Sequence, residues 1–211
     1  MKTWTKICGI KTVDALDAAL DARADYVGLV FFPKSPRHVT FEEAAALAQR
    51  ARGKANVAAL AVDADDALLD DIINHVSPDV LQLHGRESPQ RAAEIKRRYG
   101  RRVWKALPVE TAADAEQATS YLGIAEILFD AKAQKGAVLP GGNGLAFDWS
   151  ALAGVKGQFT FMLSGGLTPD NVADAIRATQ PWGVDVSSGV ETAPGVKDPD
   201  LIARFLRAAN G

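Results

Sequence analysis

Four side chains that can transfer protons or hold polar ligands stand at the ends of short apolar segments in this 211-residue chain. They are Cys8, His84, Asp130 and Asp185. A thiol and a carboxyl group can serve as general base and general acid when their surroundings adjust their pKa values. A lone cysteine is more often an inert core residue, so Cys8 is a candidate base only if other polar or ionisable side chains lie near it.

Two segments rich in serine and glycine have the composition of an anion site. Each follows an apolar run, one at residues 164–166 and the other at residues 187–189. Glycine lets backbone N–H groups approach an anion closely, and serine hydroxyl groups add further donors. Ordinary turns are the alternative, but the recurrence at two neighbouring run ends favours a phosphate site with five predicted contacts: Gly165, Gly166, Ser187, Ser188 and Gly189.

Arg37 is a candidate for binding a carboxylate. It lies in a polar connection at residues 32–39 that also contains Pro33 and Pro36. The planar guanidinium group can donate two parallel hydrogen bonds to a carboxylate, although most arginines only solubilise a surface. A further glycine cluster at residues 141–144 lacks the dinucleotide-binding pattern, and we interpret it as a mobile lid, with a structureless linker as the alternative.

The elements that position these residues alternate along the whole chain. Amphipathic helical patterns separate short apolar segments with no polar face, which is typical of a parallel sheet covered by helices. Eight such units predict an α/β fold, a closed (β/α)8 barrel forming a single domain over residues 1–211, with an open doubly wound sheet as the alternative. The predicted strands span residues 4–8, 26–31, 57–62, 80–83, 103–107, 126–129, 159–164 and 183–186.

A barrel of this kind gathers the carboxyl ends of its strands on one face. The connections after the second and sixth predicted strands, at residues 32–39 and 131–148, are longer than the others. Long connections on the catalytic face of a barrel often bind or cover substrate, although neutral insertions are also tolerated there. We therefore expect the candidate residues and both long connections to surround one site.

Composition narrows the classes of partner. The chain has 24 lysine and arginine residues against 26 aspartate and glutamate residues, and a net charge of −2. No basic cluster indicates a nucleic-acid surface, and no apolar stretch approaches the roughly 20 residues of a membrane span. The chain enters its first predicted strand without a signal-peptide core, and one cysteine is typical of a reducing compartment. We expect a cytoplasmic protein with no nucleic-acid, membrane or obligate protein partner.

An ordered set of motifs resembles the phosphoribosylanthranilate isomerase family of tryptophan biosynthesis. The motifs are KICGI at 6–10, GLVFFPKSPRHV at 28–39, LQLHG at 81–85, FDAK at 129–132, LPGGNG at 139–144, LSGGLTPDNV at 163–172 and GVDVSSGVE at 183–191. Each motif alone is moderately specific, whereas the ordered set is highly specific. The resemblance implies a (β/α)8 barrel that binds a phosphorylated small molecule, performs an Amadori rearrangement and needs no cofactor or metal.

The resemblance also implies a role for each candidate residue. Asp130 would be the general acid and Cys8 the general base, with Lys6 and Arg37 as cations that could favour the thiolate. At neutral pH the ordinary pKa values give a carboxylate and a thiol, the reverse of what these roles require. Arg37 would bind the anthranilate carboxylate and Asp185 the sugar hydroxyl or amine. His84 is expected among the substrate-binding residues.

Two other functions remain as alternatives. Cys8, His84, Asp130 and Asp185 are acceptable zinc ligands, so a metal-dependent sugar-phosphate epimerase could use the same barrel. No closely spaced ligand pair supports that hypothesis. A non-catalytic protein that binds a phosphorylated ligand is the second alternative. A two-substrate isomerase that also serves histidine biosynthesis is disfavoured, because such enzymes resemble a barrel with aspartate at the position of Cys8.

Overall fold

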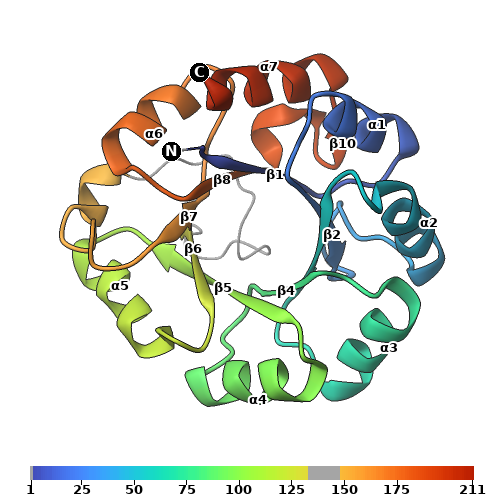
Figure 1. The fold of residues 1–211 in the computed structure, drawn as a ribbon, viewed down its shortest axis with the longest axis horizontal. Helices are drawn as coiled ribbons and strands as arrows, with labels where there is room; N and C mark the ends of the chain where they lie inside the picture. The colour runs from blue at the N-terminus through green and yellow to red at the C-terminus, as the bar shows by residue number, and fades with distance from the viewer. Residues whose placement is uncertain (1, 133–147) are drawn as a thin grey trace.

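The computed structural model describes residues 2–132 and 148–211, and within them eight parallel strands form a closed barrel. Helices surround the barrel (Figure 1). The strands are β1 (Trp4–Cys8), β2 (Tyr26–Phe31), β3 (Asn56–Ala61), β4 (Val80–Leu83), β5 (Arg102–Val109), β6 (Glu126–Ala131), β7 (Phe161–Leu163) and β8 (Gly183–Val186). Since β1 pairs with both β2 and β8, the predicted (β/α)8 barrel is confirmed and the open sheet is wrong.

The strand boundaries follow the apolar segments closely, with one instructive difference. The segment predicted at residues 159–164 is a strand only at β7, over Phe161–Leu163. Phe159 precedes the strand and packs its ring against Phe129 of β6, with the ring centroids 6.3 Å apart. Its apolar character therefore reflects core packing by a connecting segment rather than strand pairing.

Helices cover the outside of the barrel, and their ends obey ordinary capping rules. Ser88 accepts a hydrogen bond from the N–H of Arg91, Pro89 is the first helical residue, and Gly100 ends the helix in the left-handed conformation. The α-helices are α1 (Val13–Asp21), α2 (Phe41–Ala51), α3 (Asp66–Val76), α4 (Pro89–Tyr99), α5 (Ala112–Glu116), α6 (Val172–Thr179) and α7 (Pro199–Asn210).

The helical layer is less regular after β5 and β6 than the predicted pattern of one helix per strand. After β5, α5 has five residues and continues as the 3₁₀ helix η1 (Gln117–Tyr121). After β6, the described residues contain only the 3₁₀ helix η2 (Trp149–Leu152) before β7. The predicted lid at residues 141–144 lies outside the described residues. Beyond β8, the 3₁₀ helix η3 (Ser188–Val190) leads into a small hairpin, β9 (Glu191–Ala193) and β10 (Val196–Lys197).

The interior of the barrel is layered along its axis. Side chains of successive residues in a strand point to opposite faces, so alternate residues enter the barrel. One apolar cluster fills the middle of the barrel with Tyr26, Ala58, Val80, Trp104, Ala106, Leu128 and Met162. A second cluster of Cys8, Val30 and Leu60 lies nearer the carboxyl ends of β1, β2 and β3. The same alternation brings His84 and Asp130 to the carboxyl end of the barrel.

A buried ion pair fixes the turn after β4. Lys105 Nζ on β5 lies 2.9 Å from Glu87 Oε2, and both side chains are buried. The ammonium group also donates to the carbonyl oxygens of Leu83 (3.4 Å) and Gly85 (2.6 Å), on either side of His84. The carboxylate accepts from the N–H groups of Asp63 and Gly85. These bonds satisfy both charges and hold the turn that carries His84.

We expect Lys105→Met to lower the free energy of unfolding by about 3–5 kcal/mol, because Glu87 would remain buried without its cation. Urea denaturation measures this loss directly. Arg177→Ala is the matched control, since Arg177 pairs with Asp174 on the exposed face of α6 and exposed pairs contribute little. An equally small effect of both substitutions would contradict the structural role of Lys105.

Candidate active site

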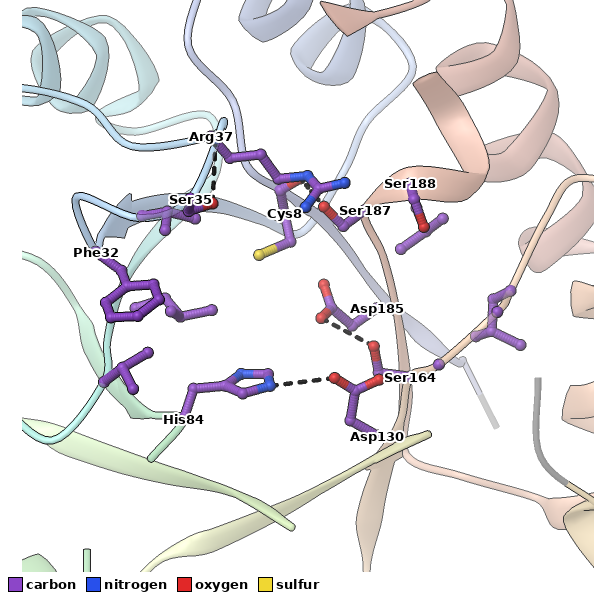
Figure 2. Close-up of a pocket in the computed structure, with 17 residues that line it drawn as sticks. Cys8, Phe32, Ser35, Arg37, His84, Asp130, Ser164, Asp185, Ser187 and Ser188 are labelled. Carbon is purple, nitrogen blue, oxygen red and sulfur yellow. Dashed lines mark hydrogen bonds and ion pairs between the residues drawn. The ribbon is translucent and has the colours of Figure 1, made fainter. Parts of the chain in front are cut away.

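A pocket opens at the carboxyl ends of the barrel strands. The predicted residues on its wall are Cys8, Arg37, His84, Asp130, Gly165, Gly166, Asp185, Ser187 and Ser188. Figure 2 shows Asp185 between Cys8 on one side and Asp130, facing His84, on the other. Side chains that are distant in the sequence thus share one cavity, as the barrel requires.

Asp130 sits near the end of β6 and both of its carboxyl oxygens have partners. Oδ1 accepts a hydrogen bond from the N–H of Ala131 at 2.9 Å. Oδ2 lies 3.1 Å from His84 Nε2. His84 Nδ1 in turn lies 3.1 Å from the amide nitrogen of Gln82. Because the carboxyl group is almost completely buried and directed into the pocket, it can exchange a proton with a bound ligand.

Cys8 ends β1 with its thiol directed into the pocket (Figure 2). Burial raises the pKa of this thiol above its ordinary value, and the charge of Asp185 adds to that effect. Lys6 and Lys197 oppose it, because a nearby cation favours the thiolate. The neutral thiol is therefore the resting form. Both cations expected to favour the thiolate interact with it: Lys6 lowers the pKa of Cys8, and Arg37 is attracted to the Cys8 charge.

Lys6 and Asp185 form a buried ion pair beneath the thiol. Lys6 Nζ lies 2.9 Å from Asp185 Oδ1, and Ser164 Oγ donates to Asp185 Oδ2 at 3.3 Å. Burial lowers the pKa of Lys6, but the charges and hydrogen bonds of Asp185 and Cys8 together outweigh it, and the net shift is upward. The pair therefore keeps a fixed positive charge next to Cys8, and it keeps Asp185 at the pocket wall.

Arg37 is buried, so it is not one of the arginines that only solubilise a surface. Its Nε and Nη2 atoms donate to the two carboxylate oxygens of Glu191, at 2.8 and 2.7 Å. Gly9 makes room for this side chain: it has φ +80°, and a Cβ there would lie 2.6 Å from Arg37 Cδ. The guanidinium group is thus held in a fixed orientation at the pocket wall.

Glu191 and Lys197 belong to this part of the site although they were absent from the predicted residues. Lys197 Nζ lies 2.7 Å from Glu191 Oε1 and donates to the carbonyl oxygen of Ser187 at 2.9 Å. Burial raises the pKa of Glu191. The hydrogen bonds and positive charges of Arg37 and Lys197 together lower it by a larger amount, so the net shift is downward. Burial lowers the pKa of Lys197. Glu191 ends a family-like motif, whereas nothing in the sequence singles out Lys197.

The two small-residue segments lie side by side at the ends of β7 and β8. Gly165 and Gly166 have φ +87° and +63°, values that favour glycine. Within residues 2–132 and 148–211, neither of their N–H groups has an acceptor. Gly189 does not line the pocket. A Cβ on Gly189 would lie 1.9 Å from the carbonyl oxygen of Leu167, so glycine is required there for packing of the two segments.

An apolar wall completes the pocket, and none of its residues was among the predicted site residues. Val30 lies in β2 and Phe32 directly after it, and Leu60 lies in β3 and Val62 directly after it, with alternate residues facing the cavity. The period of two along these segments was the signal that could have found them. A flat apolar group fits against such a wall.

The zinc alternative has no support in the geometry of the described residues. Among residues 2–132 and 148–211, no group of three or more histidine, cysteine, aspartate or glutamate side chains is arranged to share a metal ion. The cation that contacts Asp185 is Lys6.

A family-level match covers almost the whole barrel. A model of the family described as N-(5'phosphoribosyl)anthranilate (PRA) isomerase matches residues 5–208. The chain belongs to the N-(5'-phosphoribosyl)anthranilate isomerase family. The predicted family and enzyme class are confirmed, and a solved structure of the family superposes on the barrel described above.

Relatives and solved structures of this family match this chain over nearly their full length. An N-(5'-phosphoribosyl)anthranilate isomerase of Rhodopseudomonas palustris (strain BisA53) is 60% identical over 205 residues, covering 97% of this chain and 94% of the relative. A relative of the same name from Paramagnetospirillum magneticum (strain AMB-1) is 54% identical over 212 residues, covering 100% and 99%. The isomerase structure from Thermotoga maritima has a TM-score of 0.88 and 35% identity, covering 98% of both chains.

A second solved structure carries a ligand. It is a phosphoribosyl anthranilate isomerase in complex with reduced 1-(o-carboxyphenylamino)-1-deoxyribulose 5-phosphate, with a TM-score of 0.86, 34% identity and coverage of 98% of both chains. That ligand contains a carboxylate, an aromatic ring and a phosphate. Separately, no helix among the described residues of this family member combines the length and apolar character needed to cross a bilayer.

The raised pKa of Cys8 predicts how the free energy of unfolding depends on pH. The folded protein retains a thiol proton that the unfolded chain releases near its ordinary value of 9.0, so stability is full below that pH and declines above it. We expect wild-type protein to lose stability relative to Cys8→Ser between pH 8 and 10, because serine does not titrate there. Urea denaturation of both proteins across this range measures the difference, and a pH-independent difference would refute the shift.

Proposed function

We propose that the chain catalyses the Amadori rearrangement of N-(5-phosphoribosyl)anthranilate to 1-(2-carboxyphenylamino)-1-deoxyribulose 5-phosphate, a step of tryptophan biosynthesis. The observation that supports this most is the presence of a thiol and a carboxyl group in one pocket with an apolar wall and an anion-binding rim. Family membership supplies the substrate, and the pocket supplies a complementary group for each of its parts.

The first chemical step opens the furanose ring. Asp130 donates a proton to the ring oxygen, the bond from that oxygen to C1′ breaks, and the anilino nitrogen supplies the electron pair that forms the C1′–N double bond. Cys8 then removes the proton from C2′, and the released electron pair gives an enolamine. Transfer of a proton from the C2′ hydroxyl group to C1′ yields the ketone. One acid and one base are sufficient, and the redox change is internal to the substrate.

The resting thiol must lose its proton before it can act as a base. Lys6 lies directly beneath Cys8, and Lys197 adds a second positive charge, so the thiolate forms as a minor species that both cations stabilise. A minor reactive form is compatible with turnover because general bases act through the fraction that is deprotonated. Closure of the pocket by substrate strengthens these charge interactions by excluding water.

Binding uses groups at opposite ends of the pocket. Arg37 recognises the anthranilate carboxylate, and the apolar wall accommodates the aromatic ring. The N–H groups and hydroxyl groups at Gly165, Gly166, Ser187 and Ser188 bind the phosphate, with Gly189 shaping their segment. Asp185 orients a sugar hydroxyl group or the amine, and His84 contacts both substrate and Asp130.

The remaining parts of the proposal concern the protein as a whole. Residues 1–211 act as one catalytic domain in the cytoplasm, without a cofactor or metal. The partner is a phosphorylated small molecule. The net charge of −2 and the polar helix surfaces argue against a nucleic-acid, membrane or obligate protein partner.

We expect Asp130→Asn and Cys8→Ser each to lower kcat by about 10²–10⁴-fold, the usual contribution of a general acid or base. Both substitutions preserve side-chain size, so the Tm should change little. Fluorescence-monitored turnover of freshly prepared phosphoribosylanthranilate gives kcat, and thermal unfolding of the same preparations gives the Tm. Asp174→Asn, on the exposed face of α6, is the control and should retain full activity.

The outcomes separate the alternatives. Nearly wild-type kcat in folded Asp130→Asn protein would remove Asp130 as the acid, and the same result for Cys8→Ser would return the cysteine to the core. Activity lost only in proportion to a lowered Tm would also make Cys8 a packing residue. Tight binding of the phosphorylated substrate by wild-type protein without any turnover would instead support the non-catalytic alternative.

A further inference from the structure

Gln82 is a buried polar residue to which the reaction described above assigns no task. It lies on β4, two residues before His84, and its side chain is completely buried inside the barrel. Its Nε2 atom lies 3.1 Å from His84 Nδ1, while its Oε1 atom is buried without a hydrogen-bond partner among the described residues. A polar side chain in this position costs free energy unless its hydrogen bonds are used. Its contact with His84 is therefore the feature to explain.

The contact continues to the proposed acid. His84 Nε2 lies 3.1 Å from Asp130 Oδ2, so Gln82, His84 and Asp130 form a chain of three side chains from the barrel interior to the pocket. Asp130 Oδ1 already accepts the N–H of Ala131 at 2.9 Å. The proton that Asp130 delivers is consequently carried on the side of Oδ2, the oxygen that faces His84.

The number of protons shared by Gln82, His84 and Asp130 determines which nitrogen of the imidazole carries a hydrogen. If Asp130 carries the proton on Oδ2, His84 Nε2 must accept it and the ring hydrogen sits on Nδ1. If the proton has moved to the ring, His84 is an imidazolium and Nδ1 again carries a hydrogen. Both forms that hold a proton ready for the substrate therefore require an acceptor opposite Nδ1.

The amide of Gln82 can supply that acceptor. Turning its terminal amide by 180° exchanges oxygen and nitrogen without moving the side chain, and places Oε1 opposite the Nδ1 hydrogen. The turn places the amino group where the oxygen was, so one polar atom is buried without a partner in either orientation of the amide. Only the need for a proton on the His84–Asp130 pair selects the orientation with Oε1 facing His84. With Nε2 facing His84, the ring hydrogen would sit on Nε2 and point at a deprotonated Asp130, which cannot act as an acid.

We propose that Gln82 is a positioning residue that presents its amide oxygen to the Nδ1 hydrogen of His84 and thereby keeps a proton on the His84–Asp130 pair. The proposal rests on the proposed function, in which Asp130 is the general acid. Gln82 touches neither the substrate nor the reacting atoms, and it acts only through the tautomer of His84.

The ring nitrogens of His84 test this proposal directly. Long-range ¹H–¹⁵N spectra of the ¹⁵N-labelled free enzyme at pH 7.5 distinguish protonated from bare ring nitrogens, and the chain has three histidines, so His84→Asn identifies the signals. We expect Nδ1 of His84 to be protonated. A bare Nδ1 with the hydrogen on Nε2 would overturn the proposal, whatever the behaviour of any variant.

Gln82→Met provides the second arm. Methionine has a similar length and removes the acceptor together with the buried oxygen, so the Tm should be equal to or above that of the wild type. We expect the His84 hydrogen to move to Nε2 and kcat to fall by about tenfold or more, with KM nearly unchanged, a smaller loss than removal of the acid itself. Unchanged kcat in folded Gln82→Met protein would overturn the proposal.

Asp130→Asn and Gln82→Met separate the acid assignment from the role of Gln82. If Asp130→Asn loses activity while His84 has a bare Nδ1 or Gln82→Met is fully active, the role of Gln82 is wrong and the acid assignment stands. If Asp130→Asn retains nearly wild-type kcat, the assignment of Asp130 as the acid fails irrespective of the spectra, and the role of Gln82 fails with it.

Discussion

The pairing of β1 with β8 is the contact on which the site depends. This pairing closes the barrel and aligns Lys6 with Asp185, and the two side chains form a buried ion pair at 2.9 Å. A shift of one residue would turn Lys6 out of the barrel and leave Asp185 buried without a cation, which is costly. The register of closure is therefore also the register that places Cys8 above Lys6 and opposite Asp130.

The buried charged side chains at the carboxyl end of the barrel form ion pairs, and these pairs leave Cys8 and Asp130 able to change their protonation states. Lys6 pairs with Asp185, and Arg37 and Lys197 share Glu191. Within these pairs each buried charge has a partner, so the cost of burial is offset. Cys8 shares Lys6 with Asp185 and stays a thiol, with Lys6 and Lys197 favouring its ionisation. The pocket thus combines a rigid charged frame with a base and an acid that can change protonation state.

Much of this arrangement follows from the sequence, because strand periodicity and short-range motifs are local signals. Four strands were placed to the residue, and Cys8, His84, Asp130 and Asp185 meet at the face where parallel strands end. The partners of Arg37 were not predictable in the same way. Glu191 contacts it across more than 150 residues of sequence, and Lys197 looks like any surface lysine until the hairpin after β8 folds over the site. Likewise, Phe159 has the composition of a strand but packs from a connecting segment.

The assignment of Cys8 as the base and Asp130 as the acid is tested most directly by the kinetic isotope effect on turnover of substrate deuterated at C2′. If Cys8 removes that hydrogen, Cys8→Ser slows this step and the isotope effect should rise above the wild-type value. If Asp130 opens the ring, Asp130→Asn makes the earlier step limiting and the isotope effect should fall towards one. An isotope effect that falls in Cys8→Ser, or rises in Asp130→Asn, would contradict the assignment of base and acid.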